Sequence, residues 1–277
     1  MIQSMKYALA ALDMDGTLLN TDHAITDWTR EAIDRAARAG GVIALCTGRC
    51  LSELREHLAA LPGVRYAICE NGGCLYDVGE DRIISQAVID RSEAERILKL
   101  VSHYDACVQC FMQSQSYMQI AGVEAFRHYH IHDFAAVFEQ GSVFVGNMAA
   151  VRKGRELEKI NLYFTSERDK ADFRQKLGDV ELHLADSLGT GFEISPKEAT
   201  KGLGLQALCR HLGIPVERTM AVGDGGNDLE LMSAAGFSVA MGNATGEVRR
   251  AAHAVTEDND HDGAARAVVR YMLGEKA

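Results

Sequence analysis

Proline is scarce in this sequence, with only three residues in 277, and no segment has the composition of a flexible linker. No apolar run approaches the roughly 20 residues that a membrane-spanning helix requires. Internal repeats and low-complexity tracts are also absent, which argues against a repeat architecture. The composition, 47% hydrophobic and 25% charged, is typical of a soluble globular protein. The length allows one large domain or two modest ones.

The sequence also lacks an excess of basic residues. The 29 Lys and Arg residues face 39 Asp and Glu residues, which gives a formal net charge of -10. We therefore expect no nonspecific attraction to nucleic acid or to an anionic membrane, although a local basic pocket for a phosphate remains compatible with this total. Met1 to Lys6 lead directly into a predicted strand rather than a signal peptide, and we expect a cytoplasmic protein.

Cysteine is present without the pattern of a disulfide framework or a zinc site. The seven cysteines are odd in number and scattered through predicted strands and helices, which favours reduced thiols. Cys107 and Cys110 have a C-x-x-C spacing, but no second pair completes a zinc site. The H-x-H-x-H run at 128–132 is interpreted as an exposed polar face, and the acidic run at 257–260 as a solvated loop.

Predicted strands and helices alternate in the first third of the chain, and the same alternation is found again after Phe192. Such alternation predicts a parallel sheet covered on both faces, with ligands beyond the carboxyl ends of its strands. The predicted strands are 7–14, 42–46, 66–69, 219–222 and 238–241, and the predicted helices include 27–39, 51–61 and 202–212.

The middle of the chain has a different pattern, because strands near 108–112 and 117–120 follow each other without a helix between them. This pattern predicts an α+β insert with an antiparallel sheet, in which S-x-x-E at 92–95 opens a helix. The fold we expect is α/β: a doubly wound parallel sheet (Rossmann-like) formed by residues 1–84 and 192–277, with an inserted α+β domain at 85–191.

Two aspartates stand at the end of the first predicted strand. In the stretch LDMDGT, Asp13 and Asp15 follow apolar residues, and Gly16 permits a turn that swings the second carboxylate round. A carboxylate is a competent nucleophile toward phosphorus, and a second one can transfer a proton. A helix cap or a surface turn would give the same D-x-D-G-T pattern, so this motif alone leaves both interpretations open.

Two further segments carry groups typical of an anion site. Thr47 and Gly48 follow the second predicted strand, where a hydroxyl and the amides of a turn form an anion contact. Lys201 stands just before a predicted helix, where a cation gains nothing from the helix dipole, so its placement favours a local anion. Taken singly, a helix-capping turn and a solvated lysine explain these residues equally well.

The segment AVGDGGNDLELM adds acidic groups after a later strand. Asp224 ends this strand, and Asn227 and Asp228 lie at or near the start of the next helix. Carboxylates that converge with Asp13 would form an oxygen-rich site suited to Mg²⁺. Helix capping would account for Asp228, but hardly for Asp224 in its glycine-rich setting.

The order of these four segments resembles the four motifs of the haloacid dehalogenase-like phosphatase superfamily, and more closely its Cof-type group, which carries a large cap between the second and third motifs. The resemblance implies that Asp13 is the nucleophile and a Mg²⁺ ligand. It implies that Asp15 is the general acid and base and gives its main-chain carbonyl to the metal. Asp224 is similar to the direct Mg²⁺ carboxylate and Asp228 to a supporting acid of the metal site. The residues that match phosphate contacts are Met14 (through its backbone), Thr47, Gly48, Lys201 and Asn227.

The resemblance implies a Mg²⁺-dependent phosphatase that hydrolyses small phosphorylated metabolites, sugar phosphates in particular, through an aspartyl-phosphate. A phosphomutase and a non-catalytic sensor of a phosphorylated metabolite are the alternatives. The cap is expected to recognise the leaving group, and Arg127, His128 and Tyr129 are chemically suitable for this. AICENGG at 67–73 and EDNDHDGAA at 257–265 are further similarities without an assigned role. The sequence gives no indication of the oligomeric state.

Overall fold

The structure is a computed structural model and describes residues 5–120, 122–187 and 189–276. Residues 1–4, on which the expectation of no signal peptide partly rests, lie outside this description. The chain divides into two compact units. The core unit comprises Met1–Gly48, Glu56–Ser85 and Thr200–Ala277, and the cap unit comprises Arg49–Arg55 and Gln86–Ala199. In the described residues no helix combines the length and the apolar character needed to cross a membrane.

The core unit is built on an eight-stranded sheet of order β14-β13-β12-β1-β2-β3-β4-β5. Pairing is parallel from β14 to β3, and β4 runs antiparallel to β3. The strands are β1 (Leu9–Leu12), β2 (Val42–Cys46), β3 (Val64–Cys69), β4 (Cys74–Asp77), β5 (Arg82–Gln86), β12 (Thr219–Gly223), β13 (Phe237–Ala240) and β14 (Ala254–Val255). The buried apolar runs of β1 and β12 fit the centre of a sheet that is covered on both faces.

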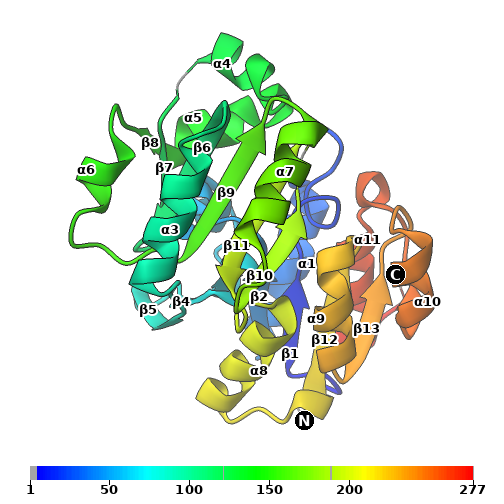
Figure 1. The fold of residues 1–277 in the computed structure, drawn as a ribbon. Coiled ribbons are helices and arrows are strands. Elements are labelled where there is room, and N and C mark those ends of the chain that lie inside the picture. The colour runs from blue at the N-terminus through cyan, green and yellow to red at the C-terminus, as the bar shows by residue number, and fades with distance from the viewer. Residues whose placement is uncertain (1–4, 121, 188, 277) are drawn as a thin grey trace. The chain divides into compact units, whose positions relative to one another are not determined.

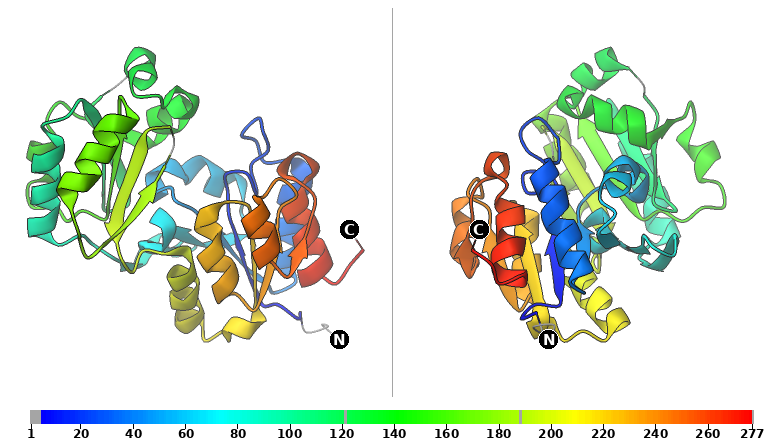
Figure 2. Two further views of the ribbon diagram at one scale, coloured as in Figure 1. Left: turned by 45° about the vertical axis from the view of Figure 1, so that its right-hand side comes forward. Right: turned by 180° about the vertical axis from the view of Figure 1, so that it is seen from behind.

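Helices cover both faces of the core sheet, as Figures 1 and 2 show. On one face, Leu205 and Leu208 of α8 and Leu231 of α9 pack in one cluster with residues of β1, β2 and β3. On the other, Ala32 of α1 packs against Ala265 of α11, and these two helices lie side by side in Figure 2. The helices are α1 (Asp27–Arg38), α2 (Arg55–Ala60), α8 (Lys201–Leu212), α9 (Leu229–Ala234), α10 (Gly246–Ala251) and α11 (Gly263–Ala267).

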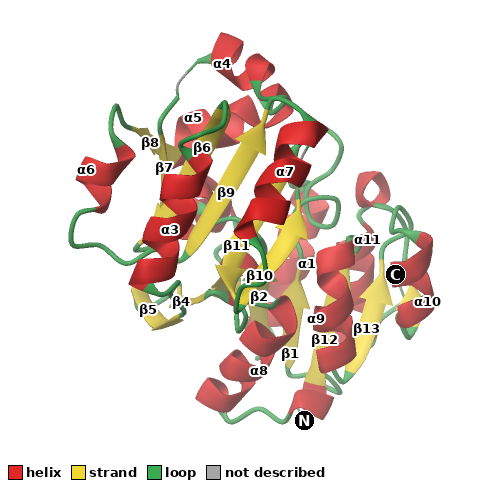
Figure 3. Cartoon of the chain, in the orientation of Figure 1, coloured by secondary structure: helices red, strands yellow, loops and turns green. Residues whose placement is uncertain are grey.

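The cap unit contains a six-stranded sheet of order β10-β11-β9-β6-β7-β8 (Figure 3). Its pairs are antiparallel except for the parallel pair β7–β8. The strands are β6 (Ala106–Met112), β7 (Gln115–Met118), β8 (Ser142–Phe144), β9 (Lys159–Phe164), β10 (Leu182–Asp186) and β11 (Gly191–Pro196). The helices are α3 (Arg91–Val101), α4 (Val123–His128), α5 (Ala135–Gly141), α6 (Met148–Arg152) and α7 (Glu167–Leu177). Apolar side chains of α3 and α7 pack on one face of this sheet.

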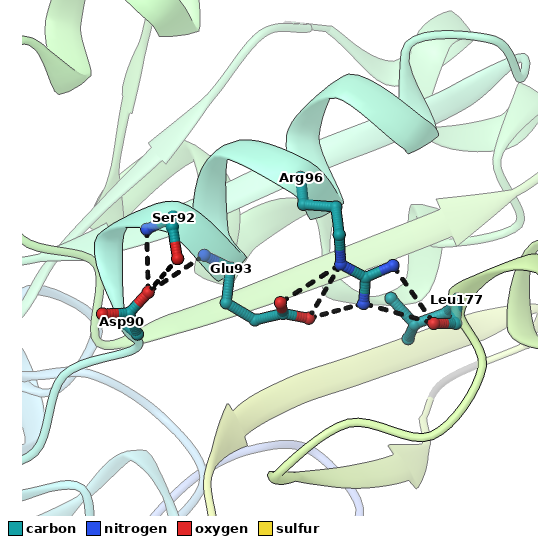
Figure 4. A network of polar contacts seen from close by, with 5 residues as sticks. All are labelled: Asp90, Ser92, Glu93, Arg96 and Leu177. Atoms are coloured by element: carbon teal, nitrogen blue, oxygen red, sulfur yellow. Dashed lines mark hydrogen bonds and ion pairs between the residues drawn. The ribbon is translucent and has the colours of Figure 1, made fainter.

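The N-cap of α3 lies two residues before Ser92, the cap that the sequence predicted. Its N-cap is Asp90, whose Oδ1 accepts hydrogen bonds from the backbone N–H groups of Ser92 at 2.9 Å and Glu93 at 3.2 Å (Figure 4). Arg96, one turn further, donates to the carbonyl of Leu177 at 3.2 Å and so ties α3 to the end of α7. The prediction of Ser92 as the cap was wrong because a carboxylate just upstream satisfies the same N–H groups.

The division into units differs from the expected boundaries in two places. β11 pairs with β9 and β10, so residues 192–199 belong to the cap unit and not to the core. Residues 49–55 also belong to the cap unit, because the N–H groups of Leu51 and Ser52 donate to Ser114 at 3.0 Å and 3.1 Å. These bonds break the predicted helix 51–61 into a 3₁₀ turn at Leu51–Glu53 and α2.

Candidate active site

The predicted site segments converge at one edge of the core sheet. Asp13 follows β1, Thr47 follows β2 and Asp224 follows β12. β1 lies between β2 and β12, and the N–H of Asp13 donates to the Val222 carbonyl at 3.0 Å, one step beyond the β1–β12 ladder. The strands β2 to β5 follow on one side of β1 and β12 to β14 on the other, so the strand order reverses at β1. Asp13 therefore lies at the point where ligands bind in doubly wound sheets.

Lys201 joins two of the aspartates. Its buried Nζ donates to Oδ1 of Asp13 at 2.6 Å and to Oδ1 of Asp228 at 2.7 Å. The sequence placed Lys201 just before a helix, whereas it is the first residue of α8, with Thr200 as the N-cap. One buried cation between two carboxylates explains why a lysine is found at the positive end of a helix.

Asp228 has both carboxylate oxygens engaged by the protein. Its Oδ2 accepts the N–H groups of Asp224 at 2.9 Å and Gly225 at 3.0 Å, while Oδ1 accepts from Lys201. A Cβ at Gly223 would lie 2.4 Å from the Asp228 Cγ, so a side chain there would displace this carboxylate. Asp228 therefore fixes the loop that carries Asp224, and this suits a supporting acid better than a freely available ligand.

Asp224 is held by the turn that follows the first two aspartates. The Thr17 hydroxyl donates to its Oδ1 at 2.8 Å. Gly16 has φ +78°, and a Cβ there would lie 2.5 Å from the Asp224 Oδ2. Both the left-handed backbone and the close approach require glycine at this position. The D-x-D-G-T sequence thus shapes the site through Gly16 and Thr17 as well as through its aspartates.

The turn itself is organised by main-chain bonds. The Met14 carbonyl accepts the N–H groups of Thr17 at 3.2 Å and of Leu18 and Leu19 at 2.9 Å each. Asp15 lies inside this turn, partly buried, and forms an isolated bridge with Leu19. The two predicted carboxylates are therefore carried by one rigid segment that leaves β1 and reverses at once.

The electrostatics of the cluster favour a cation. Burial and the neighbouring Asp228 raise the pKa of Asp13 well above its usual range, although Lys201 opposes this shift. Burial also raises the pKa of Asp224, against the hydrogen bond from Thr17. Burial lowers the pKa of Lys201, but Asp13 and Asp228 outweigh it and the net shift is upward. Asp228 adds to the upward shift of both pKa values, so repulsion among three neighbouring carboxylates contributes beside burial.

The donor set of this cluster fits a hard divalent cation. Oxygen atoms of Asp13, Asp224 and Asp228 all lie within 4.8 Å of one another. Carboxylate oxygens without nitrogen or sulfur are typical of Mg²⁺ sites. A divalent ion would also offset the burial and the repulsion from Asp228 that raise the pKa values of Asp13 and Asp224.

The predicted phosphate contacts lie around a turn that the sequence left without a role. Thr47 is buried, and its N–H donates to the Ile68 carbonyl at 2.9 Å. Asn227 is exposed, and its Nδ2 donates to Oδ1 of Asn71 at 3.3 Å. Asn71 therefore lies between the segments that carry Thr47 and Asn227.

Sequence reasoning missed three polar residues that hold the site: Thr17, Asn71 and Asn243. The Nδ2 of Asn243 donates to the Gly16 carbonyl at 2.8 Å, and its Oδ1 accepts the N–H of Asn259 at 3.1 Å. Asn259 belongs to the acidic run at 257–260, which thus braces the turn at Gly16 as well as facing solvent. Thr17 was visible in the motif, whereas no local signal distinguishes Asn243.

The cysteines offer no metal site. All seven are buried, and Cys107 and Cys110 point to opposite faces of β6, where they join different apolar clusters. Strand geometry separates these side chains, because residues three apart alternate in direction. Within the described residues, the grouping that offers a metal ion three ligands is the aspartate cluster.

Of the cap residues considered for leaving-group recognition, His128 and Tyr129 both contact Asp105. The His128 Nε2 lies 2.8 Å from Oδ2 of this aspartate, and the Tyr129 hydroxyl donates to Oδ1 at 2.9 Å. Arg127 pairs with Glu124 at 3.1 Å on the same helix. Each of these groups thus has a partner within the cap unit.

Comparison with known proteins identifies the family of this chain. The sequence profile of the haloacid dehalogenase-like hydrolases matches residues 10–268. Phosphatase YwpJ of Bacillus subtilis (strain 168) is 31% identical over 285 residues, which cover 96% of this chain and 99% of that protein. The 5-amino-6-(5-phospho-D-ribitylamino)uracil phosphatase YwtE of the same organism is 28% identical, with coverage of 96% and 99%.

The solved structures give the same result. A haloacid dehalogenase-like hydrolase from B. subtilis superposes with a TM-score of 0.82 and 29% identity, covering 94% of this chain and 98% of that one. The fold of this chain is therefore shared with that solved relative over nearly its whole length. The chain belongs to the haloacid dehalogenase-like hydrolases of the Cof type, and it is a phosphoric monoester hydrolase.

Proposed function

We propose that this phosphatase uses Mg²⁺ and a covalent intermediate on Asp13 to hydrolyse small phosphate monoesters, sugar phosphates in particular. The observation that carries the proposal is the buried Asp13 carboxylate at the end of β1, held by Lys201 at 2.6 Å beside Asp224 and Asp228. A fixed carboxylate with a cation beside it is suited to attack on a phosphate dianion.

Two chemical steps follow from this arrangement. Asp13 attacks phosphorus as the bond to the leaving oxygen breaks, and protonated Asp15 gives its proton to that oxygen. Asp15 then takes a proton from water, which attacks phosphorus and breaks the bond to the Asp13 oxygen. Inorganic phosphate leaves, and both aspartates return to their starting states.

Lys201 offsets the repulsion between carboxylate and phosphate, and it holds Asp13 in position during both steps. We assign a Mg²⁺ ion to Asp13, Asp224 and the main-chain carbonyl of Asp15, where it would supply the positive charge that keeps Asp13 ionised and lowers the repulsion. Asp228 is assigned the supporting role. Thr47, Gly48, Asn227 and the Met14 backbone are proposed to receive the phosphate oxygens.

The substrate class rests on relatives. YwtE, YcsE and YitU of B. subtilis, 27–28% identical to this chain, are named as phosphatases of 5-amino-6-(5-phospho-D-ribitylamino)uracil, a phosphate ester on a polyhydroxylated chain. A relative from Serratia proteamaculans, 29% identical, is named an HMP-PP phosphatase. A phosphate on a polyol or sugar is thus the first class to test.

The experiment is a phosphate-release screen over sugar phosphates, the ribitylamino ester and phosphorylated pyrimidines, with Mg²⁺ and with excess chelator. We expect release that needs Mg²⁺ and is lost in Asp13→Asn. The exposed Asp27→Asn in α1 is the matched control and should keep wild-type rates. Normal release by Asp13→Asn would contradict the proposal, and an isomeric sugar phosphate as the product would indicate a mutase instead.

A further inference from the structure

The turn between β3 and β4 has an unusual backbone. Glu70, Asn71 and Gly72 have φ values of +57°, +56° and +102°, so three consecutive residues adopt left-handed conformations. The left-handed conformation costs a residue other than glycine about 1–2 kcal/mol, although asparagine adopts it more readily than most residues. Such conformations persist where surrounding contacts impose them, and they cluster at functional sites.

Asn71 contacts two of the proposed phosphate-binding segments at once. Its N–H donates to the Thr47 carbonyl at 2.9 Å, and its Oδ1 accepts from Nδ2 of Asn227 at 3.3 Å. A Cβ at Gly48 would lie 3.2 Å from the Asn71 Oδ1 and 3.4 Å from its Nδ2, so the amide packs directly on that glycine. Gly48 thus leaves space for this amide.

The same turn contacts the segment that carries Lys201. A Cβ at Gly72 would lie 2.0 Å from the Thr200 carbonyl oxygen, and one at Gly204 would lie 3.0 Å from the Gly72 Cα. Thr200 caps α8, and Lys201 is the first residue of that helix. Three segments with proposed phosphate contacts therefore meet on residues 71 and 72.

We propose that Asn71 is a positioning residue for phosphate binding: its amide fixes Gly48 and orients the side chain of Asn227. An asparagine amide has two N–H groups, and the one that Asn227 gives to Asn71 sets the direction of the other. The inference rests on the proposed function, because it assumes that Gly48 and Asn227 receive phosphate. No bond is made or broken by Asn71 itself.

Two substitutions separate this role from a purely structural one. Asn71→Gly keeps the left-handed backbone at no steric cost and removes the amide. Asn71→Asp keeps an acceptor for Asn227 but exchanges the N–H₂ group for an anionic oxygen, which repels phosphate. Asp81→Gly is the matched control, since Asp81 also has a positive φ (+50°) but lies in the turn between β4 and β5.

The test is calorimetric binding of inorganic phosphate in the presence of Mg²⁺, together with kcat and KM for p-nitrophenyl phosphate and a thermal unfolding curve for each variant. We expect Asn71→Gly to weaken phosphate binding and raise KM by about tenfold, with a smaller change in kcat. Asn71→Asp should weaken phosphate binding and raise KM further. Asp81→Gly should have the phosphate affinity and KM of the wild type. A merely structural role would change the unfolding temperature without this selective effect on phosphate and KM.

Wild-type phosphate affinity and KM in folded Asn71→Gly or Asn71→Asp would overturn the inference, as would failure of the wild type to bind phosphate. The proposed function fails separately, if the wild type binds phosphate but hydrolyses no ester. Weaker phosphate binding by the Asn71 variants would still support the positioning role in that case.

Discussion

Replacing Lys201 by methionine should strongly destabilise the core unit. The Lys201 side chain is fully buried, and its Nζ is 2.6 Å and 2.7 Å from oxygens of Asp13 and Asp228. Removing one partner of a buried ion pair costs about 3–5 kcal/mol, because the other charge stays buried without compensation. We therefore expect Lys201→Met to lose about 3–5 kcal/mol of unfolding free energy at neutral pH without Mg²⁺.

The loss should depend on pH in a defined direction. Burial already raises the pKa of Asp13, and removing Lys201 removes a contact that lowers it, so the pKa of Asp13 in the folded variant rises further. An acid whose folded pKa is raised favours the folded state below its unfolded pKa of about 3.9, and this stabilisation is lost as the pH rises through the folded pKa. The difference between wild type and variant should shrink toward about pH 4 and widen toward neutral pH.

The assay is urea denaturation followed by tryptophan fluorescence. The single tryptophan, Trp28, lies on α1 and so reports the core unit. Arg38→Met is the matched control within the core unit, because Arg38 is exposed on α1 and pairs with Asp34 at 3.8 Å, where such a surface pair contributes at most about 1 kcal/mol. A loss below about 1 kcal/mol in Lys201→Met, or a loss that is equal at acid and neutral pH, would refute the reasoning.

Three further predictions concern the same site and the thiols. Gly16→Ala should abolish most phosphatase activity and lower the free energy of unfolding by at least about 1–3 kcal/mol. Gly40→Ala is the control and should keep activity, because Gly40 also has a positive φ but no atom lies near its Cβ. Equal activities of the two variants would contradict the packing of Gly16 on Asp224. Mg²⁺ should raise the unfolding temperature at neutral pH and less at acid pH, because the ion needs both Asp13 and Asp224 ionised and their pKa values are raised. Asp224→Asn should remove most of this shift, and a wild-type shift in that variant would exclude it as a ligand. An aromatic disulfide reagent should label the seven buried cysteines slowly in the native protein and all of them in denaturant; rapid native labelling would show that these thiols are accessible.

Local signals in the sequence were sufficient for many elements. The helix predicted at 27–39 is found at 27–38 and begins after Thr26, whose hydroxyl oxygen accepts the N–H of Thr29, the third helical residue. The strand at 42–46 agrees with prediction at both ends because it is apolar and ends at a turn. In these segments, capping and periodicity determine the structure without help from distant residues.

Elements that depend on distant contacts were predicted less well. Residues 51–61 have helical periodicity, but bonds from Leu51 and Ser52 to Ser114 interrupt the helix. Residues 192–196 were predicted to begin the second part of the core, yet they pair with β9 and β10 in the cap unit. No local pattern encodes either pairing, since each joins segments far apart in the chain.

The same distinction applies to the candidate site. Asp13 and Asp224 could be predicted because each follows an apolar strand and breaks its pattern, and parallel strands bring such ends together. Asn71 and Asn243 could not be predicted in detail, because their contacts with Asn227 and Gly16 span more than 150 residues in each case. Sequence patterns thus identified the charged groups, and the structure identified two amides, Asn71 and Asn243, that contact the neighbouring segments.

Rapid quenching of the enzyme during turnover, followed by mass spectrometry of its peptides, tests the central claim most directly. We predict a phosphoryl group on Asp13 that forms within the first turnover, disappears when substrate is exhausted, and is absent from Asp13→Asn. An active preparation whose Asp13 peptide stays unmodified at every time point, with phosphate released at full rate, would contradict the covalent mechanism.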